Sequence, residues 1–543
     1  MKNIKYILLL FVLIGFTACA EPEDVLDDNN IDTSTEVLPE LTAGTADFST
    51  FVSIGNSLTA GYTDNALFIA AQENSFPNTL AQKFALVGGG DFIQPLMNDN
   101  FGGLALGGTR IAQPRLVFGG AGPVPLESLI GPVTVTTDLA VNNPTGPFNN
   151  MGVPGAASFH LIAPGYGNIG NLPSAANPYF VRMTGGTPNA TIMEMAVAQA
   201  PSFVSLWIGN NDVLGYATGG GANGAPTGQG TFDFALSTIM TNLGGTQGVM
   251  ANIPYVTTIP YFTTVPHNPL DPSNPAFGPL IPTLNGIFGQ INQVFAFLES
   301  QGIPNATERQ IVFSETSASA LVIHDESLMN LSAQISGVLN ASPTFPAFVQ
   351  SFGLPAEAAP LVANLLGLVY GQARQANDGD LLVLPSSSII GTINEGFAAF
   401  LGSQGLPPTL AAQFSAEGVS LPLEDKWVVI PSEQDEIKTA IDGFNSSIQA
   451  AASNAGFAFV DANALMQQLD AGGFTDGDFT STSNLVMGGA FSLDGVHPTA
   501  RGYALIANQF MKAIDATYGS NFEASRNLVD IGDYPTNYSP ALQ

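Results

Sequence analysis

The sequence predicts an α/β protein whose core is a parallel β-sheet. Residues 51–54 and 203–208 are short apolar runs, as is typical of strands buried on both faces, and each run stops at a glycine. Between and after them, apolar residues recur at the three- and four-residue spacing of amphipathic helices. Open α/β sheets bind ligands outside the carboxyl ends of their strands. The residues that follow these two runs are therefore the first candidates for a functional site.

The other elements continue this alternation of strands and helices. Two further apolar runs are predicted as strands of the sheet, at 249–253 and 457–460, and two shorter strand-like runs lie at 311–313 and 381–384. Helical spacing is found in four segments: 76–84, 231–243, 284–300 and 500–510. Another helix is predicted to begin at Ser432, because Ser432 and Asp435 together resemble a capping box.

The net charge of the chain excludes two classes of binding partner. The 543 residues include 44 acidic and 13 basic side chains, which gives a formal net charge of −31. A polyanionic surface repels nucleic acids and anionic membranes, so we expect neither as a partner. Hydrophobic residues make up 45% of the chain, which is enough to form a large core.

Two long segments interrupt the regular pattern. Residues 88–150 are rich in Gly, Pro and Asn and are predicted to form a surface excursion. Residues 315–425 are predicted to form a largely helical insertion, with apolar helices such as the one over 361–369. Such helices are either buried core or an apolar lid or acyl-chain wall over the active crevice.

The N-terminus has the features of an export signal. Lys2 and Lys5 precede an apolar stretch at 7–16 that is too short to span a bilayer. The only cysteine, Cys19, follows directly and resembles the lipidated cysteine of bacterial lipoproteins, although Phe16 replaces the usual Leu. The alternative is an ordinary signal peptide with an incidental cysteine. Residues 19–46 are acidic, contain no basic residue and are predicted to form a flexible tether.

A serine hydrolase site can be assembled from residues at the predicted strand ends and turns. Ser57 follows the first strand and is either a nucleophile or a helix N-cap. Asn211 follows the second strand and is either an oxyanion donor or part of an Asx-turn. Of the four histidines, His497 is the best candidate base, because Asp494 three residues earlier can orient its ring. The other three (His160, His267 and His324) are predicted to be structural or surface residues.

Four blocks, in order, make the chain resemble the SGNH hydrolase superfamily, the GDSL esterases and lipases. They are Gly55-Asn56-Ser57-Leu58, Gly155 within Gly152-Val153-Pro154-Gly155, Gly209-Asn210-Asn211-Asp212, and Asp494-Gly495-Val496-His497. The resemblance extends over about residues 47–515, and Asn56 replaces the Asp of the GDSL block. It implies a flavodoxin-like three-layer α/β/α sandwich with a parallel sheet of about five strands.

By this resemblance, each site residue has an expected role. Ser57 attacks an ester carbonyl, His497 transfers the proton, and Asp494 orients His497. The N–H groups of Ser57 and Gly155 and the amide of Asn211 hold the oxyanion. The family needs no cofactor, and no spacing in the sequence indicates a metal site.

The predicted organisation is a lipoprotein signal peptide at 1–18, a tether at 19–46, a hydrolase domain at 47–520 and a C-terminal tail at 521–543. The expected function is an exported serine esterase or lipase, held at the bacterial outer membrane by its lipid, periplasmic or surface-exposed, and monomeric. Its substrate would be a small-molecule, lipid or glycan ester. The alternatives are a glycan acetyl esterase and a non-catalytic binding lipoprotein.

Overall fold

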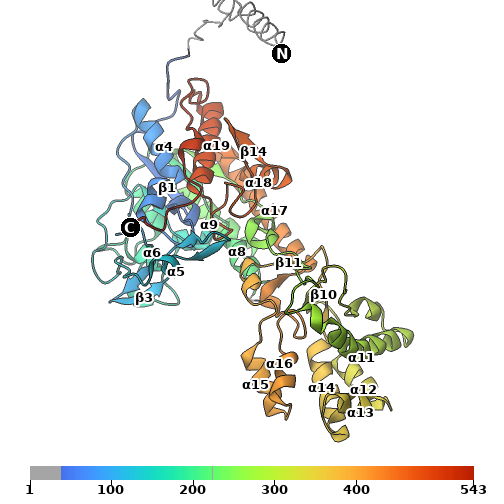
Figure 1. Cartoon of the computed structure of the whole chain (residues 1–543). Helices are drawn as coiled ribbons and strands as arrows, with labels where there is room; N and C mark the ends of the chain where they lie inside the picture. The colour runs from blue at the N-terminus through green and yellow to red at the C-terminus, as the bar shows by residue number, and fades with distance from the viewer. Residues whose placement is uncertain (1–37, 223) are drawn as a thin grey trace, which may run out of the picture.

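The computed structural model describes residues 38–222 and 224–543, which form two lobes (Figure 1). The predicted signal peptide, Cys19 and most of the predicted tether lie outside the described residues. The end of the tether segment packs on the larger lobe, where Thr42 N–H donates to Asn521 Oδ1 and Thr45 N–H donates to the Tyr518 carbonyl, both at 2.8 Å. The folded part therefore begins a few residues before the predicted boundary at residue 46.

The larger lobe is built on a five-stranded parallel sheet, as predicted. Its strands are β1 (Phe51–Gly55), β6 (Asn150–Gly152), β7 (Phe203–Trp207), β8 (Gln247–Ala251) and β13 (Ala458–Val460). The spatial order is β13-β8-β7-β1-β6, and every pairing is parallel. In chain order this is the 2-1-3-4-5 arrangement of flavodoxin-like folds, which places a switch point between β1 and β7.

Side chains alternate between two apolar layers because successive strand residues point to opposite faces. Phe51, Phe203 and Val249 pack with α4 (Phe76–Phe84) and α19 (Ala500–Tyr518). On the other face, Val52 and Val204 pack with three helices: α7 (Ile192–Val197), α9 (Gln229–Asn242) and α17 (Pro431–Ala455). The three layers are therefore helix, sheet and helix.

The smaller lobe has its own apolar core, which extends from Val265 to Ile430. It starts well before the insertion predicted at 315–425, because the apolar face of α11 packs there rather than on the sheet. Its six α-helices within the described residues are α11 (Ile281–Ser300), α12 (Ser332–Ala341), α13 (Phe345–Ser351), α14 (Ala359–Tyr370), α15 (Glu395–Ser403) and α16 (Pro408–Gln413). Two short antiparallel pairs complete it: β9 (Val322–His324) with β10 (Ala373–Gln375), and β11 (Leu381–Leu382) with β12 (Val428–Val429).

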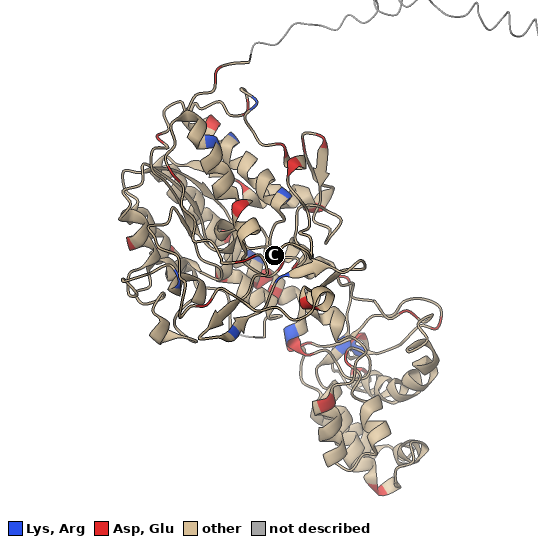
Figure 2. Cartoon of the chain, turned by 60° about the vertical axis from the view of Figure 1, so that its left-hand side comes forward, with Lys and Arg blue, Asp and Glu red and all other residues tan. Residues whose placement is uncertain are grey.

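Asp and Glu outnumber Lys and Arg in both lobes (Figure 2). No single helix of the described residues is long and apolar enough to cross a membrane. One pair of helices, Phe345–Ser351 and Ala356–Tyr370, meets the length and composition of a broken span but bends by 114°.

The predicted excursion at 88–150 carries two short hairpins and ends in a sheet strand. The hairpins are β2 (Leu104–Leu106) with β3 (Thr109–Ala112), and β4 (Leu116–Phe118) with β5 (Pro123–Pro125), followed by α5 (Glu127–Ile130). Arg115, which is fully buried, donates from Nη2 to the Ser539 carbonyl at 2.7 Å and so joins this segment to the C-terminal tail.

Two local predictions were wrong. Residues 311–313 form no strand: the N–H groups of Ile311 and Phe313 donate to asparagine side chains of α11 instead of a neighbouring strand. The helix predicted to begin at Ser432 begins at Pro431. Its capping residue is Glu433, whose carboxylate accepts from Ile430 N–H at 2.8 Å. Proline at the first helical position has no N–H to satisfy, which favours this earlier start.

Candidate active site

Ser57 lies at the carboxyl end of β1, as the first residue of the short helix α2 (Ser57–Ala60). The N-cap of this helix is Asn56, whose Oδ1 accepts from Leu58 N–H at 3.0 Å, so the interpretation of Ser57 as the cap is wrong. The Asn56 amide also donates to Asn210 Oδ1 at 3.0 Å, in a buried contact between the first and third sequence blocks. Ser57 is thus left free to face the crevice and is 7% exposed.

The structure brings Ser57, His497 and Asp494 together, although 440 positions separate Ser57 from His497. His497 Nε2 lies 2.9 Å from Ser57 Oγ, and His497 Nδ1 lies 2.9 Å from Asp494 Oδ2. Only 14% of the His497 side chain and 8% of the Asp494 side chain are exposed. This arrangement can move a proton from the serine hydroxyl to the imidazole.

Hydrogen bonds keep Asp494 ionised. Its Oδ1 accepts from the N–H groups of Val496 and His497, both at 2.8 Å. Gly495, between Asp494 and Val496, adopts a φ of +72° that favours glycine. Burial by itself raises the pKa of Asp494, but the neighbouring His497 and these hydrogen bonds outweigh it and hold the pKa at about 2. The carboxylate can therefore stabilise an imidazolium at neutral pH.

The segment that follows α2, residues 62–65, holds the loop that carries His497. The Tyr62 ring lies 4.6 Å from the His497 ring, centre to centre. Four hydrogen bonds join segment and loop: Thr63 Oγ1 to the Pro498 carbonyl (2.9 Å), Asp64 N–H to Ser492 Oγ (3.1 Å), Leu493 N–H to Asp64 Oδ1 (3.1 Å) and Asn65 N–H to Asp494 Oδ2 (2.8 Å). This role could not be predicted from the sequence, in which the one signal is the turn-forming Asp64-Asn65 pair, whose φ angles are +50° and +61° in the structure.

Gly155 and Asn211 lie side by side at the next strand ends. Gly155 adopts a φ of +81°, and its N–H donates to no group of residues 38–222 and 224–543. Asn211, the first residue of α8 (Asn211–Thr218), donates from Nδ2 to the Ala156 carbonyl at 2.9 Å. The neighbouring Asp212 accepts from Ser158 N–H at 2.8 Å and from Ser158 Oγ at 2.7 Å, which fixes the Gly155 turn against α8.

The other histidines have different surroundings. His160 Nδ1 accepts from Ala157 N–H at 3.0 Å, and its ring stacks on Tyr166 at 4.3 Å. His324 is in β9, and His267 is in a loop of the smaller lobe.

A predominantly apolar cavity opens beside Ser57 and His497. Its walls come from the end of β7, α8, the 3₁₀ turn η4 (Val256–Thr258), α18 (Ala462–Ala471), α19 and residues 490–498. No residue of 315–425 lines it. The helical insertion is therefore not the wall of this cavity, contrary to the alternative of an apolar acyl-chain wall.

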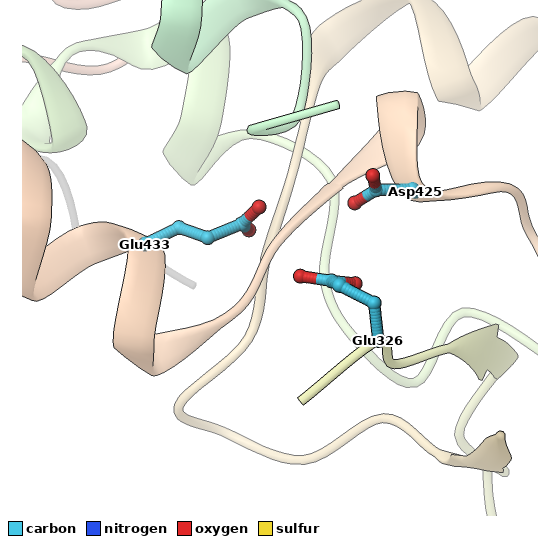
Figure 3. A group of neighbouring side chains, drawn as sticks. All are labelled: Glu326, Asp425 and Glu433. Carbon is cyan, nitrogen blue, oxygen red and sulfur yellow. The ribbon is translucent and has the colours of Figure 1, made fainter. Parts of the chain in front are cut away.

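Three carboxylates converge where the smaller lobe joins the larger one (Figure 3). One carboxylate oxygen from each of Glu326, Asp425 and Glu433 lies within 4.8 Å of the other two. Burial, followed by repulsion from neighbouring carboxylates, raises the pKa of Glu433 to about 8 and that of Asp425 to about 6. About a hundred positions separate Glu326 from the other two, so sequence spacing could not reveal the group.

The fold and this site define a three-layer α/β/α protein with a Ser-His-Asp arrangement at the carboxyl edge of its sheet. Residues 349–510 match the family model described as GDSL-like Lipase/Acylhydrolase. This range contains Asp494 and His497 but not Ser57, Gly155 or Asn211. The match supports the SGNH/GDSL hydrolase superfamily predicted from the motifs, and ester hydrolysis as the general activity of the chain. No curated protein and no solved structure showed significant similarity to the chain.

Proposed function

We propose that the protein hydrolyses carboxylic esters with Ser57 as nucleophile, His497 as general acid and base, and Asp494 as the residue that orients His497. The observation that carries this proposal is the unbroken contact from Ser57 Oγ through both ring nitrogens of His497 to Asp494, with 2.9 Å at each step. Because Asp494 accepts from Nδ1–H, Nε2 is left unprotonated toward the serine hydroxyl.

The reaction proceeds in two halves. Ser57 Oγ bonds to the ester carbonyl carbon while its proton passes to His497 Nε2, and the tetrahedral intermediate then expels the alcohol, which takes that proton. A water molecule next attacks the acyl-serine and gives its proton to Nε2. Collapse of the second intermediate breaks the bond to Ser57 Oγ, which regains the proton as the carboxylic acid leaves.

The negative charge of both intermediates falls on the former carbonyl oxygen. The groups that we propose to stabilise it are the N–H of Ser57, the N–H of Gly155 and the side-chain amide of Asn211. The Asn211 amide donates one hydrogen to the Ala156 carbonyl, which fixes its orientation and leaves the second hydrogen for the oxyanion. Such donors work because they are positioned before the charge develops.

Export and lipid attachment at Cys19 are part of the same proposal, supported by the basic and apolar segments before that residue. If they occur, Cys19→Ser in the producing cell should shift the protein from the membrane fraction to the soluble fraction, and metabolic labelling with a radioactive fatty acid should be lost. Labelling that persists in the variant would exclude Cys19 as the lipidated residue.

The catalytic proposal is tested with p-nitrophenyl acetate and butyrate. Ser57→Ala should lower kcat by at least about 10⁴-fold, because the nucleophile is lost while the fold is retained. Ser237→Ala, the same change on the exposed face of α9, is the matched control and should retain wild-type turnover. Equal turnover by wild type and Ser57→Ala would refute the mechanism.

A further inference from the structure

The cavity beside Ser57 separates polar from apolar lining. Among the residues that the structure describes, its polar side chains other than the indole of Trp207 are Ser57, Asn210, Asn211 and His497, which all belong to the candidate site. The rest of the wall is aliphatic or aromatic, with Met466, Leu469 and Leu505 as examples. A ligand held by Ser57 therefore meets polar groups at its reacting end and hydrocarbon beyond it.

This lining favours an alkyl chain over a sugar. A sugar ring in the cavity would leave its hydroxyls without hydrogen-bond partners, and each such group costs a few kcal/mol. An alkyl chain loses nothing on leaving water and gains about 0.8 kcal/mol for each buried methylene. The Trp207 indole offers no alternative partner, because its N–H already donates to the Asn252 carbonyl at 3.0 Å.

The size of the cavity limits the length of the chain. The space within the cavity is about 100 Å³. A water molecule in the liquid takes up about 30 Å³, and a methylene group is of similar size, so the cavity holds a chain of a few methylene groups.

We propose that the cavity between α18 and α19 binds an unbranched alkyl chain of the ester, several carbons long. This proposal rests on the proposed ester hydrolysis at Ser57 and adds the class of substrate. The chain belongs either to the acid or to the alcohol of the ester, because the cavity contacts both Asn211 on the oxyanion side and His497 on the leaving-group side.

Two series of esters show whether the alkyl chain in the cavity belongs to the acid or to the alcohol of the ester. In p-nitrophenyl esters from acetate to palmitate only the acyl chain varies, and in acetates of alcohols from ethanol to hexadecanol only the alcohol varies. In the series that uses the cavity, kcat/KM should rise about fourfold per methylene, which equals about 0.8 kcal/mol, and level off once the chain fills the cavity. Turnover that is highest for the two-carbon member of both series would overturn the proposal.

Variants on one helix show whether the cavity sets this preference. Leu465, on α18, lines the cavity and is half-buried, so a bulkier side chain can be accommodated there with little strain. Leu465→Trp should lower the kcat/KM ratio of octanoate to acetate by at least about tenfold. Gln468→Trp, on the exposed side of the same helix α18, is the matched control and should keep the wild-type ratio. A ratio that Leu465→Trp leaves unchanged contradicts the proposal.

A binding measurement keeps the test independent of turnover. The chain has two tryptophans, and Trp207 lines the cavity whereas Trp427 does not. In Trp427→Phe, bromodecanoate should quench Trp207 fluorescence to saturation, and Leu465→Trp, with its own fluorescence subtracted, should weaken that quenching. Saturable quenching without ester hydrolysis would retain the cavity and reject the proposed function. Hydrolysis of acetate without quenching or chain preference would reject the cavity alone.

Discussion

At the scale of single residues, the site depends on side chains that each satisfy two partners. Asn56 both caps α2 and donates to Asn210, which links the strand ends that carry Ser57 and Asn211. An aspartate at position 56 could cap the helix but could not donate, so the asparagine fits the neighbour that this chain places there. The asparagine that replaces the Asp of the GDSL block therefore donates a hydrogen bond to the third block.

Asn211→Ala tests the oxyanion role. The amide contacts the reacting oxygen only as its charge develops, so we expect kcat to fall by about 10²–10³ while KM changes little. Steady-state kinetics with p-nitrophenyl butyrate measure both values. A change confined to KM would remove Asn211 from the oxyanion hole.

Asp64 is predicted to position the loop that carries His497. Asp64→Ala removes the acceptor for Leu493 N–H, and the resulting shift of the loop should lower kcat by about tenfold or more, since misplacement by 1 Å can cost about 10²-fold. Asp64→Asn retains an acceptor and should restore most of this loss. A purely structural role would instead lower thermal stability in both variants without separating their kcat values.

At the scale of elements, the sheet could be predicted where strands are buried on both faces. The strands at 51–55, 203–207, 247–251 and 458–460 were found because continuous apolar runs ended at turn residues. The edge strand β6 was missed, because Asn150, Met151 and Gly152 show no apolar run. The sequence also did not show that the core of the smaller lobe begins before residue 315. The apolar face of α11 is equally compatible with packing on the sheet and with packing on other helices.

Within the smaller lobe, one half-buried arginine joins two buried aspartates. Arg374 donates to Asp325 at 2.6 Å and to both carboxylate oxygens of Asp380 at 2.6 and 2.7 Å, with the Asp380 side chain fully buried. Arg374→Ala leaves two buried carboxylates unpaired and should lower the free energy of unfolding by about 3–5 kcal/mol. Urea unfolding measures the loss, and turnover of p-nitrophenyl acetate should stay within about twofold because the arginine lies outside the cavity. A loss of less than about 1 kcal/mol would show that the arginine does not stabilise the lobe.

At the scale of the whole molecule, the candidate site is assembled from segments separated by most of the chain. The four blocks could be predicted because each ends a strand or forms a turn. Three features could not be predicted, since each depends on packing between distant residues. They are the contacts of segment 62–65 with the loop that carries His497, the cavity between α18 and α19, and the acidic group at the junction of the lobes.

Buried carboxylates should also set the pH dependence of folding. The pKa values of Glu433, Asp64 and Asp425, about 8, 7 and 6, lie above those of free carboxyl groups, with burial as the largest cause in each case. The folded state therefore keeps protons on these three groups that the unfolded chain releases above about pH 4. Their contribution to the free energy of unfolding is complete below that pH and is lost as pH rises toward 8. Below about pH 4 the low pKa of Asp494 acts in the opposite direction.

Glu433→Gln isolates one of these groups. Glutamine retains an acceptor for Ile430 N–H but binds no proton, so the decline of the unfolding free energy between pH 5 and pH 8 should become shallower. Asp435→Asn, which removes an exposed charge from the same helix, is the matched control and should leave the slope unchanged. Urea titrations across this range give the slope. If Glu433→Gln leaves the slope at its wild-type value, Glu433 is already ionised in the folded protein. A bound cation or ordered water must then compensate the charge of the three carboxylates.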